Sequence, residues 1–271
     1  MKIEDIDISH PDKPIFPDRE ITKLDLVTYY DKIADKMLPY LKDRPLTLQR
    51  FPDGIESDGF YQKNAADYFP EFIETISIET KEGRNTQVIC NDKKTLIYLA
   101  NQGVITFHIW LSKKEKLNTP DKVIFDLDPP KDAFEKVKEA TQNIGAFLQK
   151  QGKNPHVMTT GKSGFHVWYD IRRTKDFDER REEAKSFAEK MKEEHPEILT
   201  TATRKDNRDN KVFIDYLRNA YGQTSVCPYS LRPIPSAGVA TPLDWEELSK
   251  IKKPDQYRFS NIFRRLGQKN G

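Results

Sequence analysis

Residues 123–130 read Val-Ile-Phe-Asp-Leu-Asp-Pro-Pro, an apolar run that leads into two aspartates and ends at two prolines. Side chains alternate between the two faces of a β-strand, so Asp126 and Asp128 would lie on the same face. Proline cannot continue a central strand, so both carboxylates would lie at its end, near solvent. Two hard oxygen ligands on one rigid strand form half of a divalent metal site. The stretch therefore predicts a metal-binding strand, with two solvated aspartates as the simpler alternative.

A third carboxylate interrupts another apolar run. Residues 212–216 read Val-Phe-Ile-Asp-Tyr, so Asp215 breaks a strand in the same manner as Asp126. Polar side chains that could contact an anion follow soon after it: Arg218, Gln223, Ser230 and Arg232. The pattern predicts a second carboxylate-bearing strand that contributes to the same site.

The segment from Thr160 to His166 reads Thr-Gly-Lys-Ser-Gly-Phe-His and lies between two apolar runs, which predicts a strand, a turn and a returning strand. Backbone N–H groups in such a turn, together with Lys162 and the hydroxyl groups, can hold phosphate oxygens. The spacing is not that of a Walker A loop, and no helix follows. A plain hairpin turn needs glycine, but it does not need Thr, Lys, Ser and His together.

These parts are consistent with one chemistry. Three carboxylates on two strands can hold two Mg²⁺ or Mn²⁺ ions about 3.5–4 Å apart, the arrangement for in-line phosphoryl transfer. The turn at 160–164, with His166, Arg218 and Arg232, would neutralise a triphosphate. We therefore expect a 3′-hydroxyl nucleophile and catalysis by positioning and charge stabilisation.

Composition indicates a cytoplasmic, soluble protein. Of 271 residues, 32% are charged and only 36% are hydrophobic, and no apolar run is long enough for a membrane span or a signal peptide. Cys90 and Cys227 are far apart in sequence, which excludes a zinc ribbon and favours a reducing compartment. The net charge of +2 argues against a polycation, but basic residues gather in 204–211 and 250–271. Such local patches are compatible with a nucleic-acid partner and are also common on ordinary solvated surfaces.

The remaining chain predicts a mixture of helices and short strands. Thr22 and Asp25 form a capping pattern, and apolar residues at helical spacing extend that helix to Leu41. The prolines of residues 10–17 predict irregular backbone. Strands are expected in 44–63, where a hairpin forms, and in 73–111, and helices are expected in 134–148, in 184–194 and near 260–267.

Several motifs resemble one family. D-L-D-P at 126–129, T-G-K-S-G-F-H at 160–166 and D-Y-L-R-N at 215–219 are similar to the active-site motifs of the archaeo-eukaryotic primase superfamily. Further segments resemble the polymerase domain of ligase D-type non-homologous end-joining proteins of bacteria and archaea: H-P-D-K at 10–13, T-K-x-D-L-x-x-Y-Y at 22–30, R-P-x-T-L-x-R-x-P-D-G at 44–54, F-Y-Q-K-N at 60–64, P-Y-S-L-R at 228–232 and A-T-P-L-D-W-E-E-L at 240–248. The likeness covers nearly the whole chain.

The resemblance implies an α/β (α+β) fold with mostly antiparallel central sheets, flanking helices and two merged modules around an active-site cleft. It implies a single primase-polymerase domain over residues 1–271. An N-terminal module of about residues 1–120 would carry the 5′-phosphate and template-binding elements, and a catalytic module would follow from about residue 121.

The resemblance also implies roles for individual residues. Asp126, Asp128 and Asp215 would be catalytic and would hold Mn²⁺ or Mg²⁺, with no zinc. The incoming nucleotide would contact His108, Thr160, Gly161, Lys162, Ser163, His166, Arg218, Gln223, Ser230 and Arg232. A DNA 5′-phosphate would be held by His10, Lys13 and Lys23, and template bases would stack on Phe60 and Tyr61. Thr160 stands where many relatives have Ser and Arg218 where some have Gln, and both replacements keep donors.

The activity implied is a template-dependent nucleotidyltransferase of DNA repair that fills gaps at DNA ends and prefers ribonucleotides. No ligase or nuclease motif accompanies it, so we expect a stand-alone polymerase with separate Ku and DNA ligase partners, near the nucleoid and away from membranes. The alternatives are a replicative-type primase, which commonly has a zinc motif, and a non-catalytic DNA-end-binding module, which would not need three aspartates. A metal-dependent nuclease would not need the triphosphate-binding turn.

Overall fold

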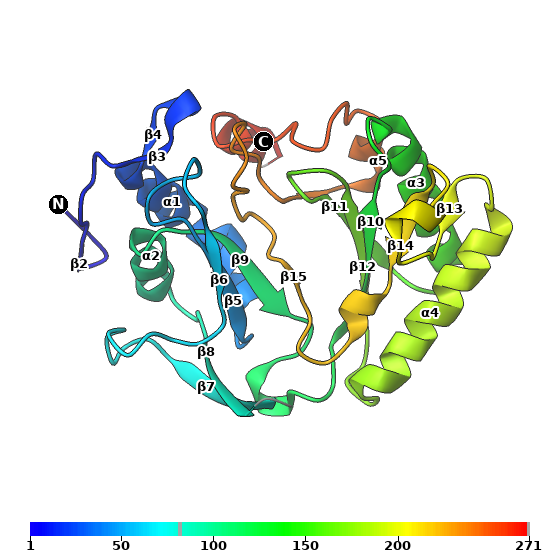
Figure 1. The fold of residues 1–271 in the computed structure, drawn as a ribbon, viewed down its shortest axis with the longest axis horizontal. Helices are drawn as coiled ribbons and strands as arrows, with labels where there is room; N and C mark the ends of the chain where they lie inside the picture. Colours follow the sequence, from blue (N-terminus) through cyan, green and yellow to red (C-terminus); the bar gives the residue numbers. More distant parts are fainter. Residues whose placement is uncertain (81–82, 270–271) are drawn as a thin grey trace. The chain divides into compact units, whose positions relative to one another are not determined.

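The structure, a computed structural model, describes residues 1–80 and 83–269. The chain forms two compact units (Figure 1). Unit 1 comprises Met1–Glu115, Thr224–Val239 and Arg258–Gly271, and unit 2 comprises Lys116–Gln223 and Ala240–Tyr257. Each unit combines helices with mostly antiparallel strands, which confirms the predicted α/β class.

Unit 1 is built around an antiparallel four-stranded sheet in the order β15–β9–β5–β6. Its strands are β5 (Leu46–Arg50), β6 (Phe60–Gln62), β9 (Val104–Trp110) and β15 (Thr224–Val226). The hairpin predicted in residues 44–63 is confirmed, because β5 and β6 pair directly. β6 lies at the edge of this sheet, so its side chains are open to solvent.

The helix α1 (Lys23–Leu41) begins and ends where the sequence predicts. The Thr22 hydroxyl accepts from the backbone N–H of Asp25, and the Asp25 carboxylate accepts from the backbone N–H of Thr22, so two groups at the helix start are satisfied. The apolar residues at helical spacing form its buried face. Capping and periodicity agree here, which is why the prediction succeeds.

One expectation for unit 1 is confirmed but incomplete, and another, for residues 10–17, is wrong. The strands expected in 73–111 are present as β7 (Thr75–Thr80), β8 (Gly83–Val88) and β9, and the sequence patterns missed a helix among them, α2 (Lys93–Asn101). The Asp92 side chain caps α2, but its nine residues give too few turns for a clear period between strands. The segment 10–17 contains the strand β3 (Pro14–Phe16), which pairs with β4 (Ile21–Thr22). Proline begins this short strand at an edge, where its missing N–H costs no ladder bond.

The other elements of unit 1 are short. They are β1 (Lys2–Ile3), β2 (Ile6–Asp7), the 3₁₀ helices η1 (Pro17–Arg19) and η2 (Lys114–Lys116, whose last residue begins unit 2), and α6 (Ile262–Lys269). The closing helix expected near 260–267 is confirmed by α6.

Unit 2 contains a six-stranded sheet in the order β13–β14–β10–β12–β11–β16, in which only β13 and β14 are parallel. The strands are β10 (Lys122–Asp128), β11 (Pro155–Thr159), β12 (Phe165–Asp170), β13 (Leu199–Thr200), β14 (Val212–Asp215) and β16 (Thr241–Leu243). The helices are α3 (Phe134–Lys150), α4 (Phe177–Glu194), α5 (Trp245–Leu248), η3 (Lys205–Asn207) and η4 (Leu217–Asn219).

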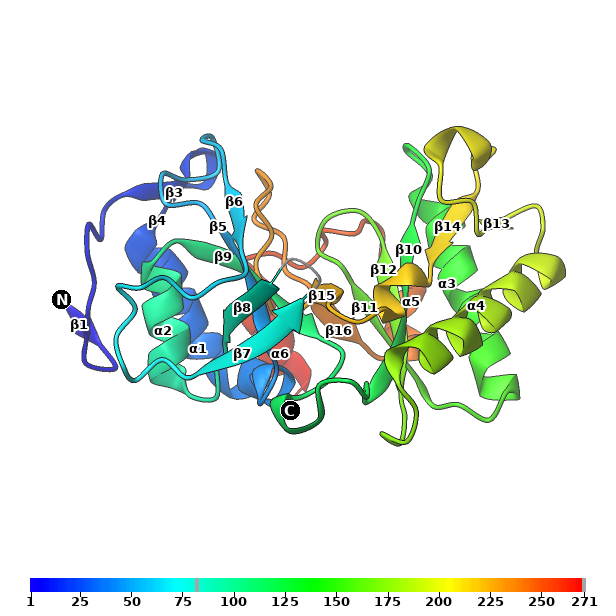
Figure 2. The ribbon, with the colours of Figure 1, turned by 60° about the horizontal axis from the view of Figure 1, so that its bottom comes forward.

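The alternation of side chains along β10 gives the unit 2 sheet one buried face and one functional face. Val123, Phe125 and Leu127 are fully buried in a core shared with α3 and α4. Both helices lie on that side of the sheet in Figures 1 and 2. Asp126 and Asp128 point to the opposite face, because strand residues alternate. The core thus fixes the direction in which the two carboxylates point.

Among the described residues, no helix is long and apolar enough to cross a lipid bilayer. Both cysteines are free thiols buried in unit 1.

Candidate active site

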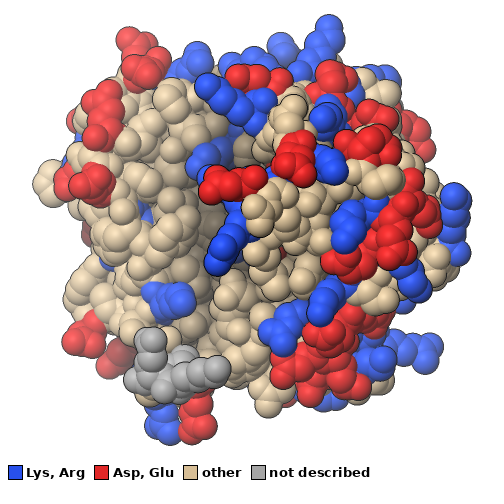
Figure 3. Space-filling view, turned by 45° about the vertical axis from the view of Figure 1, so that its right-hand side comes forward, with Lys and Arg blue, Asp and Glu red and all other residues tan. Residues whose placement is uncertain are grey.

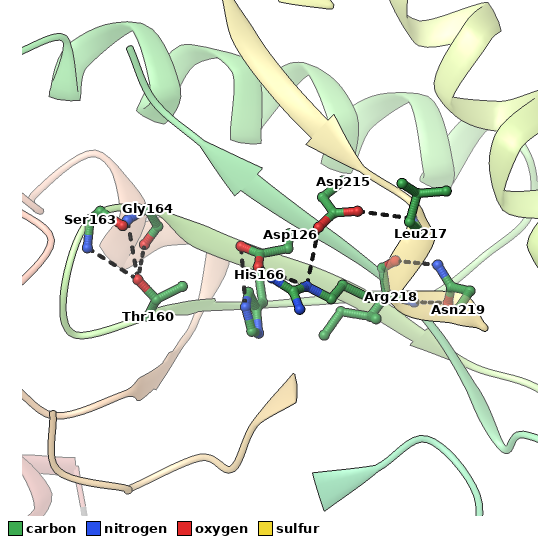
Figure 4. Close-up of polar contacts among 10 residues, drawn as sticks. Asp126, Thr160, Ser163, Gly164, His166, Asp215, Leu217, Arg218 and Asn219 are labelled. Carbon is green, nitrogen blue, oxygen red and sulfur yellow. Dashed lines mark hydrogen bonds and ion pairs between the residues drawn. The ribbon is translucent and has the colours of Figure 1, made fainter. Parts of the chain in front are cut away.

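Three predicted site residues lie in one row across adjacent strands of unit 2. The register places Asp126 of β10 opposite Asp215 of β14 on one side and opposite His166 of β12 on the other. The His166 Nε2 atom lies 3.3 Å from the Asp126 Oδ1 atom, and both side chains are largely enclosed (Figure 4). The His166 Nδ1 atom is buried and has no hydrogen-bond partner among the described residues. The sheet register therefore brings together motifs that lie far apart in the sequence.

Asp128 completes the set, two residues further along β10 and on the same face. Burial, and then the charges of Asp126 and Asp215, raise the pKa of Asp128 to about 6. Burial also raises the pKa of Asp215, although Arg218 opposes that change. Three carboxylates close together in a partly buried place repel one another, so this face attracts positive charge.

Arg218 supplies part of that charge. Its Nε atom lies 3.1 Å from Asp215 Oδ2 and 3.6 Å from Asp126 Oδ2, so the guanidinium bridges the two carboxylates (Figure 4). The other Asp215 oxygen accepts from the backbone N–H of Leu217 at 2.9 Å. The side chain of Arg218 remains 40% exposed, so it can also reach a ligand on this face.

A second arginine, Arg208, acts on the carboxylates, and the sequence patterns did not predict this. Arg208 follows η3, and its guanidinium carbon lies 3.9 Å from the ring centroid of Phe213, the residue paired with Asp128. Its charge lowers the pKa values of Asp128 and Asp215. The sequence by itself shows residues 204–211 only as a local basic patch. The available signal was that this basic loop leads directly into the strand that ends in Asp215.

The turn from Thr160 to Gly164 is braced by its own threonine. The Thr160 hydroxyl accepts from the backbone N–H of Ser163 at 3.3 Å and of Gly164 at 3.1 Å, and it donates to the Gly164 carbonyl at 3.2 Å (Figure 4). These bonds use the Thr160 hydroxyl and two of the N–H groups expected to hold phosphate. The side chains of Lys162 and Ser163 are exposed, and Gly161 has the positive φ of +73° that a glycine favours. Lys162 and Ser163 are therefore better placed than Thr160 to contact a ligand.

Gly164 holds this turn against β10. A Cβ atom on Gly164 would lie 2.0 Å from the carbonyl oxygen of Leu127, which is the residue between the two aspartates. No larger residue fits without moving the backbone. The glycine thus brings the donor-rich turn next to the end of the carboxylate strand.

The chemistry of the donor set fits divalent cations. Carboxylate oxygens are the ligands that Mg²⁺ and Mn²⁺ favour, and a cation would relieve the repulsion that raises the pKa of Asp128. Within residues 1–80 and 83–269, however, no group of three His, Cys, Asp or Glu side chains is arranged to enclose a metal ion. Arg218 occupies the space between Asp126 and Asp215, so a cation needs that guanidinium to give way.

The other residues predicted to contact the nucleotide differ in their burial and in the unit to which they belong. Gln223 is exposed and is the last residue of the first segment of unit 2. His108, Ser230 and Arg232 belong to unit 1. Ser230 is fully buried, and its hydroxyl accepts from the Phe107 N–H and donates to the Phe107 carbonyl, at 3.2 and 3.3 Å. We therefore interpret Ser230 as a structural residue of unit 1.

The three residues predicted to hold a 5′-phosphate lie together in unit 1. The backbone N–H of Lys13 donates to the His10 carbonyl, and the backbone N–H of Lys23 donates to the Lys13 carbonyl. The Lys13 ammonium pairs with Asp53, and the buried Lys23 ammonium donates to the Ser9 hydroxyl at 2.7 Å. Burial, and then the charge of Lys13, lower the pKa of Lys23. An anion between the two ammonium groups would relieve this repulsion.

Free backbone N–H groups at the start of α1 would be expected to add to this pocket, because a helix N-terminus attracts anions. The N–H groups of Lys23 and Leu24 instead donate to the carbonyls of Lys13 and Pro11, and the N–H of Asp25 donates to the Thr22 hydroxyl. The pocket therefore relies on side chains.

The two aromatic residues predicted to stack on template bases are both exposed, Phe60 by 46% and Tyr61 by 60%. Because they are consecutive in β6, they lie on opposite faces of the sheet. Tyr61 makes an edge contact with the His108 ring at 5.6 Å between centroids, and Phe60 lies over the Arg50 guanidinium. They cannot form one continuous stacking surface, so only one of them shares a face with His108.

Lys and Arg are interspersed with Asp and Glu over the right-hand side of the face shown in Figure 3, while much of its left-hand side carries neither. This agrees with the net charge of +2. Contacts with an anionic polymer would therefore come from local groups such as Lys13, Lys23 and Arg208.

We expect Asp128→Asn to stabilise the protein at pH 7.5. The pKa of Asp128 is about 6 in the folded state and near 3.8 in the unfolded state, so the folded state binds more protons. The destabilising effect of this carboxyl group therefore grows as pH rises from about 4 to 6, and it is fully present above pH 6. Removing the charge should raise the free energy of unfolding by roughly 1 kcal/mol at pH 7.5, allowing for partial exposure. Urea unfolding with a chelator at pH 7.5 and pH 5 measures this.

The matched control is Asp170→Asn, which removes an aspartate that is 70% exposed at the other end of β12. We expect no comparable gain from it. If the free energy of unfolding depends on pH in the same way for both variants, the Asp128 charge does not destabilise the folded protein as expected.

Comparisons with known proteins point to one family. A family model described as "LigD, primase-polymerase domain" matches residues 22–271. The "Bifunctional non-homologous end joining protein LigD" of Bacillus subtilis is 32% identical over 257 residues, which are 94% of this chain and 41% of that protein. The "Multifunctional non-homologous end joining protein LigD" of Pseudomonas aeruginosa is 31% identical over 265 residues, which are 97% of this chain and 32% of that protein.

A solved structure of the "Polymerase Domain from Mycobacterium tuberculosis Ligase D in complex with DNA" matches with a TM-score of 0.90 and 25% identity, over 97% of this chain and 94% of that chain. This match and the family model confirm the predicted primase-like fold. The chain spans 41% and 32% of the length of the two LigD proteins above, so the alignment concerns one part of each.

Proposed function

Because this chain belongs to the LigD primase-polymerase domain family, we propose that it is a template-dependent DNA nucleotidyltransferase of non-homologous end joining that fills gaps at DNA ends. The observation that carries the proposal is the row formed by His166, Asp126 and Asp215, with Asp128 on the same face and Arg218 bridging two of the carboxylates. The solved relative is described as being in complex with DNA, which supports DNA as the partner of this chain.

In the proposed reaction the primer's 3′-hydroxyl oxygen forms a bond to the α-phosphorus of the nucleotide. The bond from that phosphorus to the bridging oxygen breaks, pyrophosphate leaves, and the hydroxyl proton passes to solvent. Asp126, Asp128 and Asp215 would hold two Mn²⁺ or Mg²⁺ ions, which supply charge neutralisation at the reacting oxygens. The protein's own contribution is to keep three carboxylates charged and aligned on one rigid face.

The triphosphate would be neutralised by groups around the carboxylates. Arg218 is ion-paired with Asp126 and Asp215, and we propose that it changes partners to a phosphate group when nucleotide and cations bind. Lys162 and Ser163 would contact phosphate oxygens from the 160–164 turn, and Gln223, His108 and Arg232 are further proposed contacts. His166 would hold Asp126 in orientation through its Nε2 atom.

DNA recognition would use unit 1. We propose that Lys13 and Lys23, with His10, hold the 5′-phosphate at the far side of a gap, and that an exposed aromatic of β6 stacks on a template base. The proposal includes Ku and a DNA ligase as partners in the cytoplasm, since the similar proteins are named for end joining.

Two other functions make different predictions. A replicative primase would start chains without a primer, and a non-catalytic end-binding module would bind DNA without adding nucleotides. Extension assays on gapped, nicked and primer-free templates separate all three. We expect extension at gaps and little synthesis without a primer. Equal synthesis on primer-free templates would favour the primase, and binding without extension would favour the end-binding module.

We further expect ribonucleotides to be used more efficiently than deoxyribonucleotides. A site that hydrogen-bonds the 2′-hydroxyl leaves a polar group unpaired when that hydroxyl is absent, which lowers kcat/KM. The ratio should be about tenfold or more, from one hydrogen bond worth roughly 1–3 kcal/mol. Single-turnover rates for ATP and dATP opposite the same template base, with Mn²⁺ held constant, measure it. Equal kcat/KM values for the two sugars would contradict this expectation.

A further inference from the structure

Asn219 is the residue after Arg218, at the end of η4, and its side chain is buried in unit 2. Its Nδ2 atom donates to the carbonyl oxygens of Ile124 and Tyr216, at 2.7 and 2.8 Å. Its Oδ1 atom accepts from the backbone N–H of Ile124 at 2.9 Å (Figure 4). One side-chain amide therefore satisfies both backbone polar groups of Ile124, two residues before Asp126.

The Asn219 amide makes the hydrogen bonds to Ile124 that a longer β14 would otherwise make. The pairing of β10 with β14 runs from Asp128 to Asp126 and stops there, because β14 ends at Asp215. Backbone groups of every second residue face the same neighbouring strand, so Ile124 would be the next residue of β10 to pair. Without Asn219 its buried N–H and carbonyl would lack partners on that side, which is costly. The chain can leave the sheet directly after Asp215 because Asn219 completes the ladder.

Leaving the sheet at that point is what brings Arg218 to the carboxylates. The turn is fixed at its start by the bond from the Leu217 N–H to Asp215 Oδ1 and at its end by Asn219. Arg218 lies between these two anchors, with its Nε atom 3.1 Å from Asp215 and 3.6 Å from Asp126. The hydrogen bonds of Asn219 go to the backbone of Ile124 and Tyr216, so Asn219 acts on the site through the backbone that carries its neighbour Arg218.

We propose that Asn219 is a positioning residue for nucleotide binding. By pairing with Ile124 it holds Arg218 on the carboxylate face, and it thereby sets the affinity for the triphosphate of the incoming nucleotide. This inference rests on the proposed function, which assigns Arg218 to a phosphate group.

The test is a double-mutant cycle with Asn219→Ala, Arg218→Ala and the double variant. Each is measured in single-nucleotide addition to a primed template, with kcat and the nucleotide KM determined separately and DNA affinity measured by anisotropy. Asn219→Ala should raise the nucleotide KM about tenfold, the worth of one charge-assisted contact, and change DNA affinity less than about twofold. In the Arg218→Ala background, Asn219→Ala should raise KM by less than about twofold, because the group it positions is gone.

Trp245→Phe is the control for lost stability. It removes a 2.7 Å bond from the Trp245 indole N–H to the Pro155 carbonyl, a side-chain to backbone bond in the same unit. It should lower Tm and leave KM unchanged. If Asn219→Ala does not fold, Asn219→Ser keeps a small uncharged polar side chain without the two-point contact to Ile124, and the same rise in KM is expected.

Two results would overturn the positioning role. One is that Asn219→Ala raises the nucleotide KM by the same factor in the wild type and in the Arg218→Ala background. The other is that Trp245→Phe raises the nucleotide KM as much as Asn219→Ala does. A wild-type protein that extends no primer would instead overturn the proposed function, so the two failures are distinguishable.

Discussion

Asp126→Asn and Asp215→Asn should each lower the rate of nucleotide addition by roughly 10³-fold or more, while the protein stays folded and still binds DNA. Each substitution removes one charge from the face that would hold the cations, and metal ions contribute several kcal/mol of transition-state stabilisation. Stability should hold or rise, because the remaining carboxylates repel one another less. Rapid-quench measurement of single-nucleotide addition gives the rate, and thermal unfolding checks the fold.

Asp170→Asn is the matched control, since this aspartate is exposed at the opposite end of β12 from the proposed site. It should extend primers at the wild-type rate. Near-normal addition by Asp215→Asn would contradict the assignment of the carboxylates, whatever the effect of the other variants.

The pair of lysines in unit 1 should give the second large effect. The double variant Lys13→Ala, Lys23→Ala should erase the preference of the wild type for a gap with a downstream 5′-phosphate over one with a 5′-hydroxyl. Each charge-assisted contact contributes roughly 1.5–3 kcal/mol, or about tenfold to a hundredfold in affinity. Extension on an open template-primer should stay nearly intact. Anisotropy titrations of the two gapped duplexes at one fixed salt concentration measure the preference.

Lys2→Ala provides the control, because Lys2 is an exposed lysine of unit 1 that pairs with Asp7 at 3.6 Å. It should keep the full preference. The pocket assignment is wrong if the wild type and the double variant show the same small preference, and the primase alternative would gain support.

The sequence predicted the carboxylate face well because it depends on local alternation. Asp126 and Asp128 are two residues apart in a strand, so their common face follows from the backbone alone. That Asp126 lies opposite Asp215 and His166 depends on the register of three strands, which alternation cannot supply. The resemblance to a known family placed these residues together before the register was known.

Other parts of the site depend on contacts that sequence patterns do not reveal. The sequence predicts Thr160 as a hydrogen-bond donor to the nucleotide, but its hydroxyl is bonded to Gly164 inside the turn. The N–H groups of Lys23 and Leu24 at the start of α1 are taken by the carbonyls of Lys13 and Pro11, just before β3. Arg208 stood in a basic loop, and only the folded chain places it on Phe213. In each case the residue type was visible and its partner was not.

The most direct test of the central claim is whether the template base selects the nucleotide. Four gapped duplexes that differ only in the base opposite the gap are each offered the four ribonucleotides one at a time, with Mn²⁺ and with a chelator. The account predicts that the complementary nucleotide is added fastest in all four duplexes and that the chelator stops the reaction. Addition of the same nucleotide to every duplex, or no addition to any of them, would contradict it.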